Sequence, residues 1–597
     1  MAHTPASSTA DNSNATAIAE AWKAAALRRE HQRTLSQESA EHYAIAIAGI
    51  IAIFTLFHWS RFLYSRYSSK SVKQSGFMKA QVAVTRAVRS VLTHRVPGFT
   101  SIGHSVLVTL FILLNILFLF INMEFNSVIP FAKRLAWMAI SNIAFVTFLA
   151  LKNTPLAFLT AYSYERLNGL HQVAGYTTVL FALLHGILMS IGFVKLNYNS
   201  IFKERAEIFG ITAGAALFVM MVFATVVRRI RYEVFYVSHI AMFIIIIVMV
   251  ASHQPHIAEK AVIGVILAGS IWAADRIVRG IRVVWYSYDN RATVTALPHG
   301  GTRVVLRRSP SRAVPGTHCF LWLPQIRLLE THPFTIVSNS PTSLELVISA
   351  YDGFTKDLHN YAKKNPNAIL RASIDGPYGA IPDFSKAADR VILVAGGSGA
   401  SFTFGVAIDM IKKLGDQPKA IIDFIWTVRE QEALTWFSKE LDILRASPMV
   451  NLILHSTRPS DTKSPASTIW GHSDTVPSSP TLPTSPRDIE KQQSGLSYKN
   501  TSSFTSTTSH LDVEKTPNQT SNPWDSSTSV TSINVLPGRP DIDTIIRDIV
   551  AKSGDDERIA IAACGPDALT WSVRKTATNC IKVKGPSIEL HCEQFGW

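Results

Sequence analysis

Cysteine is scarce in this chain, with 4 among 597 residues. The cysteines are Cys319, Cys564, Cys580 and Cys592. All four follow the last long apolar segment, and none has the spacing of a zinc-ligand pair. The pattern argues against a disulfide framework and favours a reducing compartment for the C-terminal half.

Charge is also scarce, and acidic residues are fewer than basic ones. Charged residues make up 17% of the chain and hydrophobic residues 47%, while 58 Lys and Arg against 43 Asp and Glu give a net charge of +15. The basic residues cluster beside apolar segments, where they set membrane orientation. We therefore expect membrane lipid, and no nucleic acid, as a partner, and a chain long enough for several domains.

The first 40 residues lack the apolar core of a signal peptide and carry one glycosylation sequon at Asn14. Seven apolar segments follow, at about 43–64, 104–123, 135–151, 170–192, 208–227, 234–252 and 260–278, each near the ~20 residues that span a bilayer. We predict an extracytoplasmic tail over 1–42 and a transmembrane region of about seven helices over 43–280.

Basic residues predict the orientation of these spans. The loop after the first span is rich in Lys and Arg, and the fifth and seventh are followed by Arg228, Arg229, Arg231, Arg276, Arg279 and Arg282. These loops share one side, which the positive-inside rule makes cytoplasmic. The N-terminus is then expected outside and everything after residue 280 in the cytosol.

Four histidines in two apolar segments have matched spacing. His171 and His185 lie 14 residues apart, as do His239 and His253. On an α-helix, 14 residues come within about 40° of four turns and rise about 21 Å, so each pair shares one helix face. One such histidine is as readily a packed polar residue, but intramembrane ionisable residues default to function. We predict an inner b haem on His171 and His239 and an outer one on His185 and His253.

Two glycines accompany these histidines: Gly175 lies one turn after His171, and Gly186 follows His185. Small residues there let a flat porphyrin approach the backbone, although helix packing explains them equally well.

The pattern changes beyond residue 285. Short β-rich runs predict an antiparallel β-barrel over 285–385. From residue 386 strand-like and helical runs alternate to 597, which predicts an α/β domain with a parallel sheet. Residues 459–535 interrupt this domain, and their Ser, Thr and Pro content predicts a disordered insertion.

Three short motifs in the barrel region suit a flat, phosphorylated ligand. Thr331–Thr335 is expected to end a strand and to line such a ligand, or simply to be a strand end with a proline. Gly353–Thr355 joins a strand to a helix start, which suits a pyrophosphate. Asp375–Gly379 predicts a tight turn.

The α/β region carries a glycine-rich turn. The strand 391–395 runs into Gly396–Ala400 and then a helix, so backbone N–H groups can face a dinucleotide phosphate. The turn is not a strict G-x-G-x-x-G motif. Trp426 and Arg429 end the second strand and Arg458 the third; arginine there favours the 2′-phosphate of NADPH, the alternative being solvated surface arginines.

These motifs together resemble the fungal ferric-chelate reductases of the ferric reductase and NADPH oxidase superfamily, over roughly residues 100–597 without the insertion. The matching residues are Tyr164–Asn168, Arg229, Tyr232, Glu233, Phe235, His332–Thr335, Gly396–Ala400, Cys564–Pro566 and the tail Glu593–Trp597.

The resemblance implies a helical haem core over about 100–280, joined to a ferredoxin-reductase-like pair of domains with FAD, NADPH and two b haems. The implied FAD residues are His332, Pro333, Phe334, Thr335, Gly353, Phe354, Thr355 and Trp597. The implied NADPH residues are Gly396, Gly397, Ser398, Gly399, Ala400, Trp426, Arg429, Arg458, Cys564, Gly565 and Pro566.

The implied function is a multi-pass plasma-membrane reductase. It moves electrons from cytosolic NADPH to an outside ferric or cupric chelate, with a downstream iron permease as a further partner. Two alternatives stay open: an NADPH oxidase that reduces oxygen to superoxide, and a non-catalytic haem scaffold. The equal 14-residue spacings and the lack of an EF-hand loop favour the metalloreductase, and the intact His332–Thr335 and Gly396–Ala400 motifs speak against the scaffold.

Overall fold

The computed structural model describes residues 8–67, 76–123, 125, 127–160, 164–254, 260–415, 420–458, 534–581 and 585–593. The chain divides into one unit of residues 1–459 with 533–597 and a second of Ser460–Ser532. The predicted insertion lies outside the described residues up to 533. Its last predicted residue, Val535, instead begins strand β11 (Val535–Pro537), so this boundary was placed too late.

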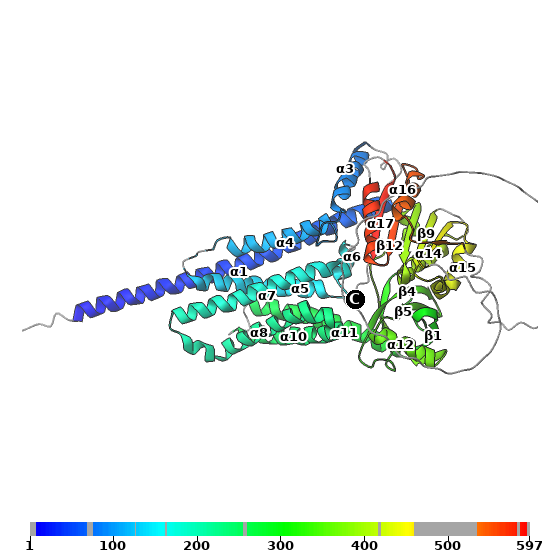
Figure 1. The fold of residues 1–597 in the computed structure, drawn as a ribbon. Helices are drawn as coiled ribbons and strands as arrows, with labels where there is room; N and C mark the ends of the chain where they lie inside the picture. The colour runs from blue at the N-terminus through cyan, green and yellow to red at the C-terminus, as the bar shows by residue number, and fades with distance from the viewer. Residues whose placement is uncertain are drawn as a thin grey trace, which may run out of the picture. The chain divides into compact units, whose positions relative to one another are not determined.

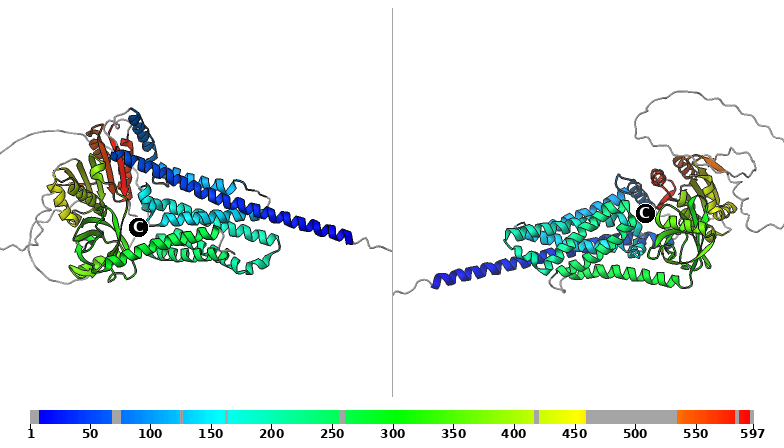
Figure 2. Two further views of the ribbon diagram at one scale, coloured as in Figure 1. Left: turned by 180° about the vertical axis from the view of Figure 1, so that it is seen from behind. Right: turned by 60° about the horizontal axis from the view of Figure 1, so that its bottom comes forward.

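Helices form the N-terminal half, and most of the long ones run side by side in Figure 1 and in both views of Figure 2, whereas α3 stands apart from them. They are α1 (Ser8–Tyr67), α3 (Gly76–Leu92), α4 (Ile102–Phe120), α5 (Val128–Ala150), α6 (Pro155–Thr160), α7 (Tyr164–Lys195), α8 (Arg205–Val222), α10 (Tyr232–His253) and α11 (Lys260–Ser287). Most of the predicted N-terminal tail is therefore helical, because α1 already begins at Ser8.

Six of the described helices, rather than the seven predicted spans, are long and apolar enough to cross a membrane. The predicted span 135–151 forms α5, which is not among the six. Polar residues of α5 are buried against its neighbours: Asn142 accepts a hydrogen bond from Tyr43 at 2.9 Å and donates to Asn115 at 2.6 Å. Protein partners thus satisfy groups that lipid cannot.

The second part of the chain, which we call the antiparallel domain, is built on a seven-stranded sheet of order β6-β1-β2-β5-β4-β3-β7. Its strands are β1 (Arg291–Leu297), β2 (Gly301–Leu306), β3 (His318–Trp322), β4 (His332–Ser340), β5 (Ser343–Ser349), β6 (Ala368–Arg371) and β7 (Ser373–Tyr378). The end strands β6 and β7 are separated only by the buried Ala372, so the sheet curls back on itself. Helix α12 (Gly353–Lys364) packs Phe354 and Leu358 into its core.

Two local predictions for this domain were wrong. The motif His332–Thr335 begins strand β4 instead of ending a strand, because it pairs with β3 from His332 onward. Residues up to Tyr378 belong to strand β7, so the predicted tight turn at Asp375 is an extended strand paired with β3.

The last part, the parallel domain, has a six-stranded sheet of order β11-β10-β9-β8-β12-β13 in which every neighbouring pair is parallel. Its remaining strands are β8 (Arg390–Gly396), β9 (Ile421–Val428), β10 (Val450–Ser456), β12 (Arg558–Cys564) and β13 (Ser587–Glu593). Its helices are α14 (Ala400–Leu414), α15 (Ser438–Ala446), α16 (Ile542–Ala551) and α17 (Asp567–Cys580), with the short η5 (Gln431–Phe437) before α15.

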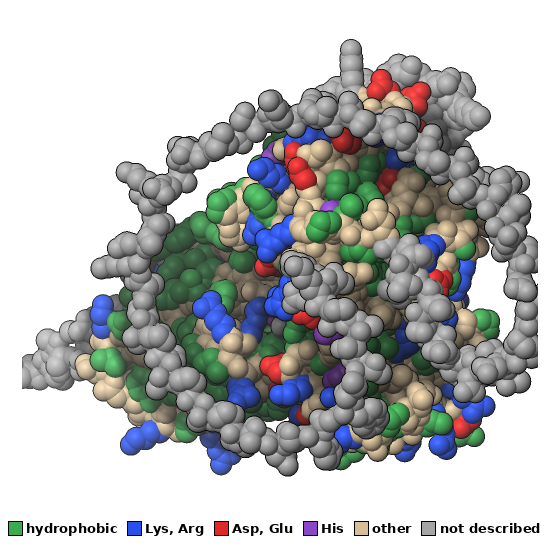
Figure 3. Space-filling model, turned by 45° about the vertical axis from the view of Figure 1, so that its right-hand side comes forward, with side chains coloured by type: hydrophobic (Ala, Val, Ile, Leu, Met, Phe, Trp, Pro, Cys, Tyr) green, Lys and Arg blue, Asp and Glu red, His purple; other side chains and the backbone are tan. Residues whose placement is uncertain are grey.

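Side chains of the central strand alternate between two cores. Leu393 and Ala395 join the cluster under α14, whereas Ile392 and Val394 join the cluster under α16 and α17. A sheet buried on both faces explains why β8 is apolar at nearly every position. The predicted fold class is confirmed: a helical membrane part, then an antiparallel sheet, then a parallel one. In Figure 3, apolar side chains mass on one part of the visible face and charged ones are spread over another.

Candidate functional site

The four membrane histidines form two pairs of equal geometry. The ring centroids of His171 and His239 lie 6.4 Å apart at an interplanar angle of 68°, and those of His185 and His253 have the same separation and angle. Two metal–nitrogen bonds of about 2.0–2.1 Å each, plus the two ring radii, place the rings of axial ligands about this far apart. The pairing predicted from sequence order is therefore the pairing that the helices produce.

Three of these rings are oriented by backbone carbonyls. Nδ1 of His171 lies 3.1 Å from the Val146 carbonyl oxygen, and Nδ1 of His185 lies 2.8 Å from that of Ala132. Nδ1 of His253 lies 2.8 Å from the Ala206 carbonyl oxygen. A ring that donates from Nδ1 keeps the lone pair of Nε2 for a metal, as in most metal-ligating histidines.

Glycines leave room beside these pairs. A Cβ added at Gly175 or Gly186 would meet nothing within 4 Å, so open space adjoins the backbone at both positions. At Gly210, by contrast, an added Cβ would lie 2.7 Å from the ring of His253. Paired, oriented imidazoles with open space beside them fit a haem at each level.

The antiparallel domain places the predicted flavin motif against a helix start. His332 stacks on Phe354 with centroids 4.3 Å apart, and Phe334 lies 6.0 Å from the same ring. Helix α12 begins at Gly353, which has φ +52°, and has neither a side-chain cap nor an acidic residue in its first turn. Its free N–H groups suit a pyrophosphate, and the aromatic wall suits a flat ring, so these residues fit FAD.

Thr355 and Phe354 act locally in this motif. The Thr355 hydroxyl accepts a hydrogen bond from the Tyr351 N–H at 3.0 Å and so fixes the approach to the helix. Phe354 is 2% exposed, so it supports His332 from inside the core. Trp597, the predicted aromatic cover, lies outside the described residues.

A cleft of about 900 Å³ opens where the carboxyl ends of β8, β9 and β12 meet. The strand order reverses between β8 and β12, which is where open α/β sheets bind nucleotides. Nine of the predicted NADPH residues line it: Gly396, Gly397, Ser398, Gly399, Trp426, Arg429, Cys564, Gly565 and Pro566. Ala400 is fully buried beneath the turn, and Arg458 does not line the cleft.

Close packing explains two glycines of the turn. A Cβ at Gly399 would lie 2.3 Å from the carbonyl oxygen of Cys564, so any side chain there separates the two loops. Gly397 has φ +56° and open space above it, which leaves its backbone accessible to a ligand. The indole N–H of Trp426 donates to the Gly397 carbonyl at 3.1 Å and holds the turn from below.

Several cleft residues were not predicted from the sequence, among them His299, Tyr351, Glu430 and Arg539. Glu430 adjoins the predicted Arg429 and is bonded by Arg458 and, at 2.9 Å, by His299 Nδ1. In the sequence, only its position beside Arg429 could have indicated that Glu430 lines the cleft. Nothing in the sequence indicated this for His299, because His299 lies in the β1–β2 turn of the other domain.

Cys564 is buried, and its thiol stays protonated. Burial, followed by the nearby Glu593 and Cys592, raises the pKa of the Cys564 thiol to about 12. Its thiolate is therefore rare at neutral pH, and it does not serve as a nucleophile.

A buried carboxylate joins α11 to the antiparallel domain. Asp375, 1% exposed, accepts a hydrogen bond from Arg279 Nε at 2.6 Å and another from the Tyr378 hydroxyl at 2.7 Å. Arg282 lies 3.6 Å from the same carboxylate. Burial and Asp375 together raise the pKa of Tyr378, so its hydroxyl keeps the proton that it donates.

Three family models match consecutive parts of the chain. A ferric reductase like transmembrane component matches residues 135–250, an FAD-binding domain matches 288–382, and a ferric reductase NAD binding domain matches 388–578. Two of the three matched parts, residues 135–250 and 388–578, are similar to ferric reductase domains. The flavin motif and the cleft fall within the matched parts, as do His171, His185 and His239, whereas His253 lies three residues beyond the first match.

Curated relatives agree with this similarity. A probable cell surface ferric reductase of Aspergillus oryzae is 29% identical over 58% of this chain and 51% of its own length. A ferric/cupric reductase transmembrane component of Candida albicans is 25% identical over 75% of this chain and 54% of its own length. The chain thus spans about half the length of these relatives.

Solved structures also match parts of the chain, at low sequence identity. The ferredoxin reductase of a carbazole 1,9a-dioxygenase has a TM-score of 0.30 and 14% identity, covering 51% of this chain and 69% of its own. A ferredoxin NADP+ reductase from Neisseria gonorrhoeae has a TM-score of 0.30 and 12% identity, covering 50% of this chain and 97% of its own.

Proposed function

We propose that this chain is a plasma-membrane metalloreductase. It takes electrons from cytosolic NADPH and delivers them, by way of FAD and two b haems, to a ferric or cupric chelate on the extracytoplasmic side. Reduced iron then becomes available to an iron permease, which we propose as a downstream partner.

The observation that carries this proposal is the pair of matched histidine couples on α7 and α10. On each helix, the histidine of one couple lies 14 residues from the histidine of the other couple, which is about 21 Å along the helix axis. Both couples have ring centroids 6.4 Å apart. Two sites in series across most of a bilayer suit transmembrane electron transfer and have no role in a reductase confined to the cytosol.

The residues of the chain have separate tasks in this scheme. His171 and His239 would hold the inner haem, and His185 and His253 the outer one. Val146, Ala132 and Ala206 accept hydrogen bonds that fix three of the four rings. Haem would supply one-electron redox chemistry, and FAD would accept two electrons from the nicotinamide and release them one at a time.

Cations in the cleft support NADPH over NADH. Arg429 and Arg539 both line the cleft, and Arg429 ends the second strand, where the adenosine ribose sits in such folds. Arg458 acts indirectly, because it forms an ion pair with Glu430. Among the described residues of this strand end, Glu430 is the carboxylate expected near a 2′-phosphate, and Arg458 neutralises its negative charge.

Membrane potential assists the proposed direction. With the C-terminal domains in the cytosol, each electron moves outward, and an interior-negative potential favours a full crossing by about 2.3 kcal/mol per 100 mV. The direction depends on the proposed orientation, with the N-terminus outside.

Surface reduction in whole cells tests the function. The chain is expressed in cells without their own surface reductases, a ferric chelate is supplied outside, and an impermeant chromogen traps ferrous iron. The assay is repeated with superoxide dismutase and under nitrogen, with the His185→Ala variant as a control that cannot complete the outer pair.

Direct metal reduction survives both treatments in the wild type and is lost in the variant. Reduction abolished by both treatments means that oxygen is the acceptor and that the chain is an NADPH oxidase. Protein that binds no FAD even when FAD is supplied contradicts both functions.

A further inference from the structure

The nucleotide cleft has walls from two domains. Most of its lining belongs to the parallel domain, but His299, Ser349 and Tyr351 come from the antiparallel domain. A nucleotide held on Gly397 therefore reaches the flavin side only when the two domains keep a fixed alignment. Transfer between bound groups is sensitive to displacements of this kind.

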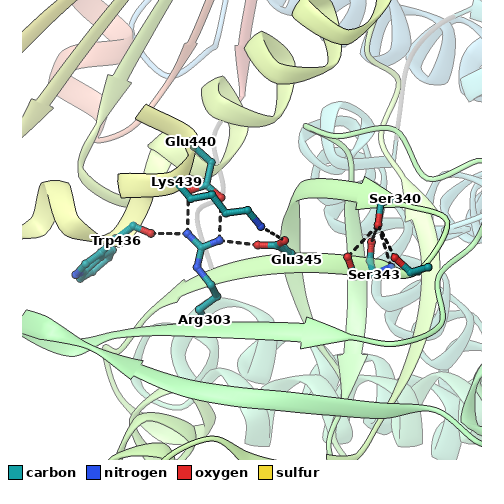
Figure 4. A network of polar contacts seen from close by, with 8 residues as sticks. Arg303, Ser340, Ser343, Glu345, Trp436, Lys439 and Glu440 are labelled. Atoms are coloured by element: carbon teal, nitrogen blue, oxygen red, sulfur yellow. Dashed lines mark hydrogen bonds and ion pairs between the residues drawn. The ribbon is translucent and has the colours of Figure 1, made fainter. Parts of the chain in front are cut away.

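Arg303 on β2 supplies a direct link between these domains. Its guanidinium donates to Glu440 at 2.8 Å from both terminal nitrogens and to the Trp436 carbonyl at 2.7 Å. It also donates to Glu345 on the neighbouring β5 at 2.6 Å. Figure 4 shows the guanidinium between the two carboxylates, with Glu440 and Trp436 on the parallel domain.

The link is buried and balanced. The side chains of Arg303, Glu345 and Glu440 are 16%, 9% and 2% exposed. Lys439 crosses in the opposite direction, from α15 of the parallel domain, and donates to Glu345 of the antiparallel domain at 2.7 Å. A two-pronged Arg–carboxylate pair fixes orientation as well as distance, and a lysine cannot reproduce it.

The ionisation of these groups agrees with a persistent charged network. Burial alone lowers the pKa of Arg303, but Glu440 and Glu345 outweigh it and raise that pKa above its ordinary value. Burial opposes the ionisation of Glu345, yet Lys439 and Arg303 hold its pKa below its ordinary value.

Trp436 connects this network to the cleft. Its carbonyl accepts from Arg303, its indole N–H donates to the Pro298 carbonyl at 2.7 Å, and its side chain lines the cleft. A Cβ at Gly301 would lie 2.6 Å from the indole, so the turn and the ring are in close contact. His299, the next residue of the same turn, also lines the cleft.

We propose that Arg303 is a positioning residue for hydride transfer: through Glu440 and Trp436 it holds the two walls of the cleft in register, so that bound NADPH meets the flavin. The proposal rests on the proposed function. Arg303 itself touches neither nucleotide nor flavin in this scheme. The step concerned moves a hydride from the nicotinamide to the flavin, which takes up both electrons.

The test separates nucleotide-driven reduction from other reduction. Full-length protein with FAD is purified as wild type, Arg303→Met, Arg303→Lys and Glu440→Gln. The matched control is Asp442→Asn, which removes the same charge from α15 at an exposed carboxylate that pairs only weakly, at 3.9 Å, with Arg445. Stopped-flow absorbance follows flavin reduction by NADPH and, separately, by dithionite, and each rate is normalised to bound FAD.

We expect Arg303→Met and Glu440→Gln to slow NADPH-driven reduction by about ten- to a hundred-fold. Dithionite-driven reduction stays at the wild-type rate, Arg303→Lys recovers part of the loss, and Asp442→Asn behaves as wild type. If Arg303→Met does not fold, Glu440→Gln and Arg303→Lys carry the test.

Three outcomes overturn the proposal. Wild-type NADPH rates in Glu440→Gln and Arg303→Met contradict it directly. Equal slowing of both reductants, or loss of FAD and a lower melting temperature at an unchanged rate per bound FAD, means that the network is only structural. A wild-type protein that NADPH does not reduce contradicts the proposed function instead, and is recognised before any variant is compared.

Discussion

The four paired histidines of α7 and α10 differ from another histidine of the helices, His104, in the residues that their rings face. His104 on α4 packs against Gly169, where an added Cβ would lie 2.7 Å from its ring, and it has no histidine partner across a helix interface among the described residues. His171 has one, at 6.4 Å in His239. The geometry therefore distinguishes a packed histidine, His104, from a candidate haem ligand, His171. Replacing each of them by alanine should have different effects.

Haem content checks this distinction. We expect His171→Ala to lose about half of the bound haem, because one of two ligand pairs is broken while His185 and His253 stay intact. The measurement is haem per protein and the visible spectrum of the reduced protein. His104→Ala is the control and keeps the wild-type content. A His171→Ala spectrum with both haems intact contradicts the ligand assignment.

Glu430 is the carboxylate beside Arg429 in the proposed NADPH site, where its charge should disfavour a 2′-phosphate. Removing it by Glu430→Gln leaves Arg429 unopposed and releases Arg458, so the preference for NADPH over NADH should rise by about three- to ten-fold, the effect of one partly screened charge. The ratio of kcat/KM for the two nucleotides measures it. Glu432→Gln, an exposed glutamate two residues on that does not line the cleft, is the control. An unchanged ratio in Glu430→Gln removes Glu430 from nucleotide selection.

The site residues that the sequence predicts lie within single elements, whereas those found only in the structure make contacts between domains. The histidine spacing and the glycine turn lie within single elements, so their periodicity is visible in the sequence. His299 and Arg303 lie on one hairpin and act on another domain more than 100 residues away, at Glu430 and Glu440. No local pattern carries such a contact.

Helix α14 shows how one element joins two domains. It follows the glycine turn in the parallel domain, yet its Gly405 faces the other domain: an added Cβ would lie 2.5 Å from the backbone nitrogen of Gly316 and 2.8 Å from the carbonyl oxygen of Ile336. Backbone cannot move aside as a flexible side chain can.

Gly405→Ala should therefore destabilise the protein by about 1–3 kcal/mol through overpacking. Thermal unfolding in detergent measures the loss. The control is Gly49→Ala on α1, where an added Cβ meets nothing within 4 Å and alanine favours the helix. Equal melting temperatures for Gly405→Ala and the wild type would show that the domains separate at this contact without cost.

Elements were predicted well where their pattern is self-contained. Strand β8 and helix α14 lie where the sequence predicts a strand over 391–395 and a helix after the glycine-rich turn, and strand β9 ends next to Arg429 as predicted. Element ends were less accurate: His332–Thr335 begins β4, and Asp375 lies within β7. Pairing with β3 decides both ends, and pairing partners are not visible in the strand's own residues.

At the scale of the whole molecule, helix α5 determines the topology. Six helices of the described residues meet the criterion for a span, and an even number of spans would place both ends of the chain on one side. However, α5 lies along α7 in the opposite direction, because its Val146 carbonyl meets His171 and its Ala132 carbonyl meets His185. Its 23 residues are about 34 Å long, enough to cross the hydrocarbon core.

If α5 crosses the membrane, the number of spans is odd and the two ends of the chain lie on opposite sides. Three sequons report this directly: Asn14 precedes the first span, and Asn500 and Asn518 follow the last. We expect a glycan on Asn14 alone, because only the extracytoplasmic side meets the glycosylation machinery. The measurement is an electrophoretic shift on endoglycosidase treatment of the full-length protein expressed in yeast. The shift should vanish in Asn14→Gln and persist in Asn500→Gln/Asn518→Gln. A shift that depends on Asn500 and Asn518 instead would place the nucleotide cleft outside, where NADPH is not supplied, and the proposed direction of electron transfer would be reversed.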